Sequence, residues 1–169
     1  MASALLINVV ELLRSPGTTK DVDVSVDCEA LAFDDARVVD EPVGVQLRLE
    51  SMSTGVTVAG RVSATWAGEC RRCLAAVRER LTVDVDELYQ RVLEDPDAHP
   101  IVNDQIDLVS MVRENLLVAL PIGPLCRPDC PGICPQCGVD LADGACGCTV
   151  PTGDPRWAAL DALRSADDD

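Results

Sequence analysis

The stretch that decides the fold is CRPDCPGICPQCGVDLADGACGC, residues 126–148, which holds six of the nine cysteines of the chain. Another pair, Cys70 and Cys73, has the spacing C-x-x-C, and Cys28 stands alone. Tetrahedral Zn²⁺ is held by four Cys or His ligands, and closely spaced cysteines present two sulfurs to one metal. Nine cysteines divide into two four-thiolate sites and one spare. We therefore predict that zinc folds the C-terminal part of the chain.

The sequence around residues 134–138, CPQCG, has the form of a zinc knuckle, in which the glycine lets backbone N–H groups turn towards sulfur. The first predicted site therefore has the ligands Cys134, Cys137, Cys146 and Cys148. The second predicted site takes the remaining pairs, Cys70, Cys73, Cys126 and Cys130, and fastens the two halves of the protein together. Each site has four protein ligands and no open position, so we expect two structural zinc ions.

Two other assignments of these cysteines remain open at this point. A single zinc can be drawn from Cys126, Cys130, Cys134 and Cys137, with the other cysteines structural. An iron–sulfur cluster can use the same ligands, although the short C-x-C spacing and the knuckle favour zinc. A thiol redox role for Cys70 and Cys73 would be typical of a βαβ context, whereas their flanks have the pattern of antiparallel strands.

The chain is strongly acidic, with 14 Lys+Arg against 29 Asp+Glu and a formal charge of −15. Such a surface is repelled by phosphate backbones and suits a basic protein partner. The basic residues cluster only at Arg71, Arg72, Arg78 and Arg80. Direct binding of RNA through this cluster is the alternative, but an aromatic content of 2% argues against base stacking.

We expect a cytoplasmic protein with no membrane partner. No signal peptide is visible, and the longest later apolar run, Leu116–Leu125, contains two prolines and is too short to span a bilayer. In a reducing cytosol, cysteines serve as metal ligands more often than they form disulfides.

Valine alternation predicts most of the fold. Val22, Val24 and Val26 alternate with polar residues over 21–28, which predicts a half-buried strand and an inward-pointing Cys28. Further strands are expected over 38–49, 56–66 (with Gly60 at a bulge) and 81–88, after a short strand and a helical turn within 5–13. Hairpin-length loops join them. The sequence thus predicts an α+β fold with a small antiparallel, partly closed β-barrel.

One clear helix is predicted over 107–120, capped by Asp104 or Asp107, stopped by Pro121 and covering an open face of the sheet. The acidic loop before it holds the lone His99, which we expect to be solvated. A short helix with Trp157, Leu160 and Leu163 is expected after Asp154. The expected domains are 1–125 (β domain with its helix), 126–150 (zinc-binding segment) and 151–169 (short helix and acidic tail).

Several motifs, in this order, resemble the YceD-like family, also called the large ribosomal RNA subunit accumulation protein family. They are CRRCL at 70–74, IDL at 106–108 opening a helix that ends LP at 120–121, PLC at 124–126, GICPQCG at 132–138 and DPRW at 154–157. The resemblance implies a role in accumulation of 23S ribosomal RNA and no catalytic residues. It implies, as partner, a basic ribosomal protein or an RNA-processing enzyme such as a ribonuclease, with no small-molecule substrate. Many relatives lack the last four cysteines, which is consistent with the division of the sulfurs into two sites.

Overall fold

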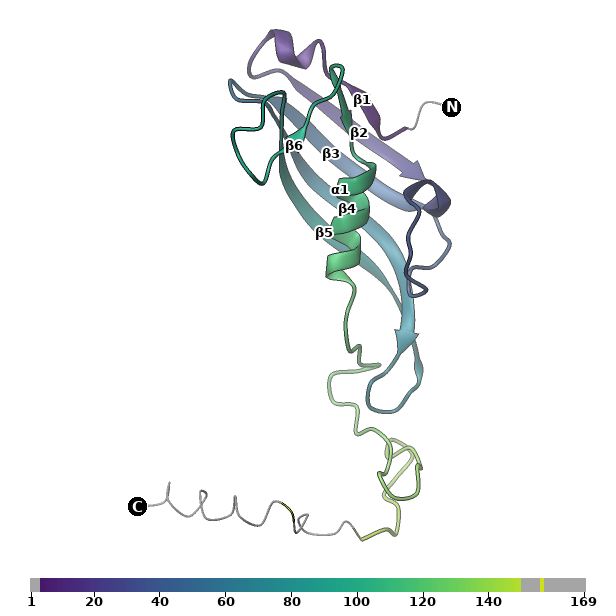
Figure 1. Cartoon of the computed structure of the whole chain (residues 1–169). Coiled ribbons are helices and arrows are strands. Elements are labelled where there is room, and N and C mark those ends of the chain that lie inside the picture. The colour runs from purple at the N-terminus through teal and green to yellow at the C-terminus, as the bar shows by residue number, and fades with distance from the viewer. Residues whose placement is uncertain (1–3, 150–155, 157–169) are drawn as a thin grey trace, which may run out of the picture.

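The structure is a computed structural model that describes residues 4–149 and residue 156. Figure 1 shows an elongated molecule, with a sheet and one helix at one end and the cysteine-rich segment at the other. The predicted helix after Asp154 lies outside the described residues, Arg156 excepted. The elements in order are β1 (Leu6–Asn8), the 3₁₀ turn η1 (Leu12–Arg14), β2 (Thr19–Val26), η2 (Cys28–Leu31), β3 (Val43–Ser51), β4 (Val56–Glu69), β5 (Ala76–Gln90), β6 (His99–Pro100), β7 (Gln105–Asp107) and α1 (Val109–Ala119).

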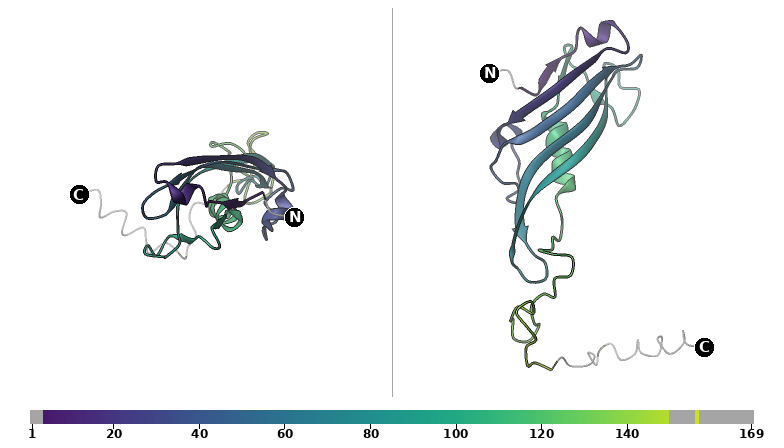
Figure 2. Two further views of the ribbon diagram at one scale, coloured as in Figure 1. Left: turned by 90° about the horizontal axis from the view of Figure 1, so that it is seen from above. Right: turned by 180° about the vertical axis from the view of Figure 1, so that it is seen from behind.

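The main sheet has five strands in the order β2-β3-β4-β5-β6, and β1 and β7 form a separate antiparallel pair. The first four strands are antiparallel neighbours, whereas β6 runs parallel to β5. The sheet is open, with β2 and β6 at its edges, so the predicted partly closed barrel is wrong. Helix α1 covers the apolar face that a barrel would have enclosed, as Figure 2 shows. Over the residues that the structure describes, the fold is mostly β with one α-helix.

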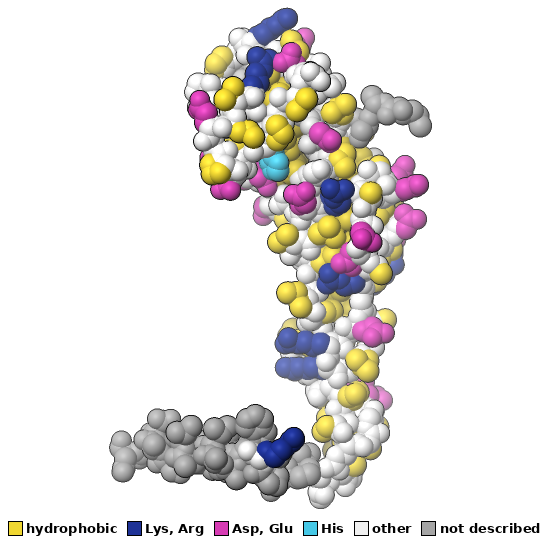
Figure 3. All heavy atoms as spheres, viewed as in Figure 1, with side chains coloured by type: hydrophobic (Ala, Val, Ile, Leu, Met, Phe, Trp, Pro, Cys, Tyr) yellow, Lys and Arg dark blue, Asp and Glu magenta, His cyan; other side chains and the backbone are white. Residues whose placement is uncertain are grey.

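The main core lies between this face of the sheet and α1. Alternate residues of β3, namely Val43, Val45, Leu47 and Leu49, are buried, and the residues between them point to the opposite face. From α1, Met111, Val112 and Leu116 complete the core. The opposite face of the sheet is polar, and no described helix or strand covers it. Figure 3 shows acidic side chains spread widely over the α1 side of the molecule.

Gly60 does not mark the predicted bulge. The pairing of β3 with β4 runs without an extra residue from Gly44 opposite Ser63 to Ser51 opposite Val56. Instead, Gly60 has a φ of 150° and passes so close to β3 that an added Cβ would lie 2.2 Å from the carbonyl oxygen of Gln46. Close backbone approach, not an inserted residue, therefore explains this glycine.

Three local predictions differ from the structure. The N-cap of α1 is Leu108, so the prediction that Asp104 or Asp107 caps the helix is wrong, although Asp107 Oδ1 accepts the N–H of Val109 at 2.9 Å. Cys28 is half-exposed at the start of η2, because the strand already ends at Val26; its predicted inward position is wrong. His99 is part of β6, not of a solvated loop, and its ring stacks on Tyr89 with centroids 4.9 Å apart.

A second, smaller core lies at the far end of β4 and β5. Its buried members are Trp66, Cys70, Val77, Leu120 and Cys130. Two cysteines thus belong to the packed interior, next to the end of the helix. None of the described helices is long and apolar enough to cross a membrane.

Candidate metal centres

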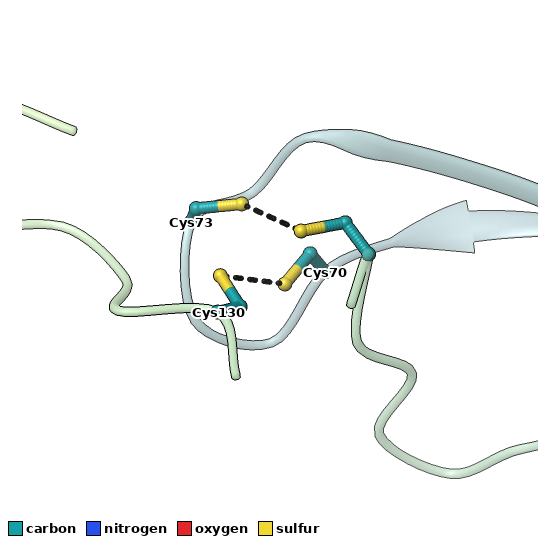
Figure 4. A group of neighbouring side chains, drawn as sticks. Cys70, Cys73 and Cys130 are labelled. Carbon is teal, nitrogen blue, oxygen red and sulfur yellow. Dashed lines mark hydrogen bonds between the residues drawn. The ribbon is translucent and has the colours of Figure 1, made fainter. Parts of the chain in front are cut away.

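Four cysteines from two distant parts of the chain meet at the second core. Cys70 and Cys73 lie in the hairpin between β4 and β5, and Cys126 and Cys130 lie on the segment that leaves α1. Figure 4 shows the sulfurs turned towards one another. The Sγ atoms of Cys70 and Cys130 are 3.7 Å apart, those of Cys73 and Cys126 are 3.6 Å apart, and all four lie within 4.8 Å of one another.

These separations fit a tetrahedral thiolate site. With Zn–S bonds of about 2.3 Å, the sulfurs at two corners of a tetrahedron lie about 3.8 Å apart. A disulfide would bring two sulfurs to about 2.05 Å, and all nine cysteines are free. The residues present therefore fit zinc, and the second predicted set of ligands is brought together by the fold.

The other four cysteines form their own cluster over residues 134–148. The Sγ atoms of Cys134, Cys137, Cys146 and Cys148 also lie within 4.8 Å of one another. Local backbone bonds build this cluster: the N–H of Cys134 donates to the carbonyl of Val139 at 2.8 Å, and Gln136 Nε2 donates to the carbonyl of Thr149 at 2.8 Å. The cluster is therefore self-contained, as its sequence spacing predicted.

Both clusters use the same turn. The N–H of Leu74 donates to the carbonyl of Cys70 at 2.9 Å, and the N–H of Gly138 donates to the carbonyl of Cys134 at 2.9 Å. Leu74 has a φ of 63° and Gly138 a φ of 74°, both in the left-handed region that favours glycine. A leucine at this position conceals the first knuckle from a search for C-x-x-C-G, whereas Gly138 identifies the second directly.

Hydrogen bonds with the hairpin fasten the two cysteine-bearing segments to each other. Arg71 donates its backbone N–H to the carbonyl of Pro124 at 2.9 Å, and Arg72 Nη1 donates to the carbonyl of Cys130 at 2.7 Å. The distal cluster is attached in turn, because the N–H of Ile133 donates to the carbonyl of Arg72 at 3.1 Å. Arg71, through its backbone, and Arg72, through its side chain, therefore help to hold the hairpin against the metal-ligand segment.

The sequence cluster of four arginines does not form one basic patch. Arg78 pairs with Glu41, and Arg80 Nη2 donates to Ser63 Oγ at 2.7 Å, both on the exposed face of the sheet. Arg71 and Arg72 lie instead at the cysteine hairpin. Three of the four guanidinium groups are thus already bonded within the chain.

The electrostatics of both clusters favour a cation. Backbone N–H groups, that of Cys73 foremost, lower the pKa of Cys70 to about 6. Hydrogen bonding to neighbouring sulfurs, first to that of Cys73, raises the pKa of Cys126 to about 12. In the distal cluster the backbone of Cys137 lowers the pKa of Cys134 to about 6, and the Cys137 side chain raises the pKa of Cys148 to about 11. Four thiolates at such short range need a metal ion to ionise together.

Cys28 and His99 belong to neither cluster. The sequence reasoning missed the second core, since no local pattern links Trp66, Val77 and Leu120; only the folded chain brings them around Cys70 and Cys130. With four sulfurs each, the clusters leave no coordination position for a substrate on a tetrahedral ion.

Comparison with known proteins identifies the family. The family described as "Large ribosomal RNA subunit accumulation protein YceD" matches residues 58–164, which include both cysteine clusters. The chain belongs to the YceD family. An uncharacterized protein of Mycobacterium tuberculosis is 37% identical over 173 residues, which cover 95% of this chain and 81% of the relative. An uncharacterized protein of Mycobacterium leprae is 32% identical over 176 residues, covering 99% of this chain and 81% of the relative.

A more distant member of the YceD family is the uncharacterized protein YlbN of Bacillus subtilis. It is 27% identical over 168 residues, which cover 95% of this chain and 97% of the relative. No solved structure matches the chain significantly. The resemblance read from the cysteine motifs is thus confirmed at the level of the family.

Proposed function

We propose that this protein is a non-enzymatic factor that supports accumulation of 23S ribosomal RNA, and so large-subunit assembly, through protein–protein contacts. The family description points to the large-subunit RNA. The observation that carries the non-enzymatic role is the pair of closed four-sulfur clusters. Zinc held by four protein ligands stabilises a fold but does not bind a substrate or activate water.

The metal is the first part of the proposal to test. Elemental analysis of protein purified without added metal should find about two zinc ions per chain. One zinc would support the alternative in which Cys126, Cys130, Cys134 and Cys137 share a single ion. Iron together with absorbance in the visible range would indicate an iron–sulfur cluster in place of zinc.

Exposed apolar residues beside an acidic loop support a basic protein as partner. Val92, Leu93 and Val102 are 74%, 56% and 58% exposed. Their segments are held side by side, because the N–H of Ile101 donates to the carbonyl of Gln90 at 2.9 Å and Arg91 pairs with Asp104. The exposed carboxylates that follow in the same loop are Glu94, Asp95 and Asp97. Exposed apolar residues with acidic residues next to them in the chain suit an interface with a basic protein.

The bonding of the arginines supports protein over RNA as the principal contact. A guanidinium that already faces a carboxylate neutralises a phosphate less well than a free one, although it keeps unused N–H donors. Here Arg72 is bonded to a carbonyl of the metal-binding segment, and Arg78 to a carboxylate. Contact with ribosomal RNA, in this proposal, is local and secondary.

Affinity purification from the native cell tests this proposal. We expect a basic ribosomal protein or an RNA-processing enzyme to co-purify with the tagged protein, and to be lost in the variant Glu94→Lys/Asp97→Lys. The variant Asp168→Lys/Asp169→Lys, with the same change in charge at the C-terminal tail, is the matched control and should retain the partner.

Two results would contradict the proposal. Retardation of naked 23S RNA by the purified protein at physiological salt would favour direct RNA binding. Free reaction of Cys70 and Cys73 with an alkylating reagent in the zinc-loaded protein would favour a thiol redox role. The cellular readout is the ratio of 23S to 16S RNA, which should fall when the protein is depleted and recover only with variants that retain the partner.

A further inference from the structure

Strand β5 has a long free edge. It pairs with β4 from Ala76 to Tyr89, but on its other side β6 pairs only with Tyr89 and Gln90. Among the described residues, no strand pairs with the outer edge of β5 from Ala76 to Leu88. A long row of unpaired N–H and C=O groups is a template for the addition of another strand.

The charges along this edge have a particular order. The exposed, alternating residues of β5 on the outer face of the sheet are Arg78, Arg80, Thr82, Asp84 and Asp86. The two cations come first and the two anions last, with a small hydroxyl residue in the centre. The side chains of Asp84 and Asp86 have no hydrogen-bond or ion-pair partner among the described residues.

This order is self-complementary about Thr82. We propose that β5 pairs antiparallel with β5 of a second copy of this chain, with a two-fold axis at Thr82. In such an isologous contact Arg78 lies opposite Asp86 of the second copy and Arg80 opposite Asp84, and the symmetry repeats each pair. Directly opposite residues in an antiparallel pair have Cβ atoms about 5 Å apart, within reach of an ion pair.

The length of the free edge gives the same axis independently. Thr82 is the midpoint between Ala76, where β5 begins, and Leu88, the last residue before β6 covers the edge. An axis at Thr82 therefore uses the whole edge and stops at the β6 strand of each copy. Moving the axis to Leu81 would leave only Arg78 opposite Asp84 as an attractive pair. Moving it to Val83 would leave only Arg80 opposite Asp86.

The inner face of the edge is compatible with this register. Leu81 and Val83 are only partly buried against the core. The axis at Thr82 places Leu81 of one copy opposite Val83 of the other copy. Such apolar pairs add cross-strand packing on the face that carries α1. Arg78 remains able to bind a second carboxylate while paired with Glu41, since a guanidinium has five N–H donors.

Charge also explains why the pairing would be selective. Charged residues usually protect a strand edge against pairing with other sheets. On β5, a second copy in a neighbouring register keeps only one kind of attractive pair, whereas a second copy about Thr82 gains both. The inference is independent of the proposed role in RNA accumulation.

Paired charge-reversal variants of the full, zinc-loaded chain test the inference. Wild-type protein should show twice the chain mass of 18.0 kDa in sedimentation equilibrium, with a dissociation constant that rises with salt. The variants Arg78→Glu/Arg80→Glu and Asp84→Arg/Asp86→Arg should each have a dissociation constant raised about 100-fold, because attractive cross-strand pairs become repulsive. A mixture of the two variants should form a heterodimer, since every opposite pair is attractive again.

Two matched controls carry the same changes in charge elsewhere on the sheet. Lys20→Glu/Arg48→Glu, on β2 and β3, and Asp21→Arg/Asp23→Arg, on the opposite edge strand β2, should both dimerise like the wild type. A wild-type protein that stays monomeric would overturn the inference, as would a dimer that persists in both β5 variants. Failure of the two variants, each shown to be folded by circular dichroism, to associate on mixing would also overturn it.

Discussion

Replacing Cys126 by serine is expected to destabilise the whole body of the protein. Cys73 and Cys126 are 53 positions apart, and the loop that a shared metal closes between them contains β5 and α1. Closing a loop of this length removes chain entropy worth about 4 kcal/mol from the unfolded state, on the entropy model for cross-links. That is a large fraction of the 5–15 kcal/mol by which domains are typically stable.

Replacing Cys137 by serine is the matched comparison. Cys126 and Cys137 are both exposed, so neither change removes buried packing. The cluster of Cys137 lies wholly within residues 134–148, and its loop contains no part of the sheet or α1. One described backbone bond, from Ile133 to Arg72, joins it to the hairpin, so the body should lose at most about 1 kcal/mol of unfolding free energy.

Urea unfolding of the zinc-loaded variants, followed by far-UV circular dichroism, measures the difference. Trp66 in the second core is a local reporter when Trp157 is changed to phenylalanine. Hydrogen exchange should show faster opening of β4 and β5 in Cys126→Ser, and faster opening of residues 134–148 alone in Cys137→Ser. Equal loss of stability in both variants, or an undisturbed body in Cys126→Ser, would refute the reasoning that the first cluster joins distant halves of the chain.

Three further predictions follow from single features. Zinc affinity should rise at least tenfold per pH unit at each cluster between pH 6 and 8. The pKa values of Cys126 and Cys148 are raised, so each of these thiols must release a proton when zinc binds. A competition titration with a chromophoric chelator checks this. Gly60→Ala should lower the free energy of unfolding by about 3 kcal/mol, measured by urea denaturation, because its Cβ would collide with the carbonyl of Gln46; an unchanged midpoint would contradict it. Cys28→Ala should leave the zinc content per chain unchanged in elemental analysis, since Cys28 lies outside both clusters.

The sequence was most informative where the relevant contacts are local. Gly138 and the spacing of Cys134, Cys137, Cys146 and Cys148 describe a loop short enough to close on itself, and the structure brings these sulfurs together. The alternation of Val22, Val24 and Val26 likewise predicted a strand whose inner face the sheet buries or half-buries. The other four cysteines were assigned to one site because nine cysteines divide into two groups of four and one spare. The fold brings these four together too. Metal binding itself and the division into 1–125, 126–150 and 151–169 stay predictions.

The alternation of apolar residues shows that a strand has a buried face, but not what covers that face. Whether a sheet curls into a barrel depends on non-local packing, and here α1 fills the space that closure would have used. The segment that contains His99 likewise lies along β5 as the short parallel strand β6, a pairing that no local pattern indicates.

By itself, the sequence determined the main strands, the helix and the local set of four sulfurs over 134–148, because periodicity and close spacing act over a few residues. Only the tertiary structure decided that the sheet stays open, that Trp66 and Leu120 form a second core around Cys70, and that β5 keeps a free edge centred on Thr82. Those features arise where segments far apart in the chain meet, and the free energy of such contacts depends on the shape of the whole molecule.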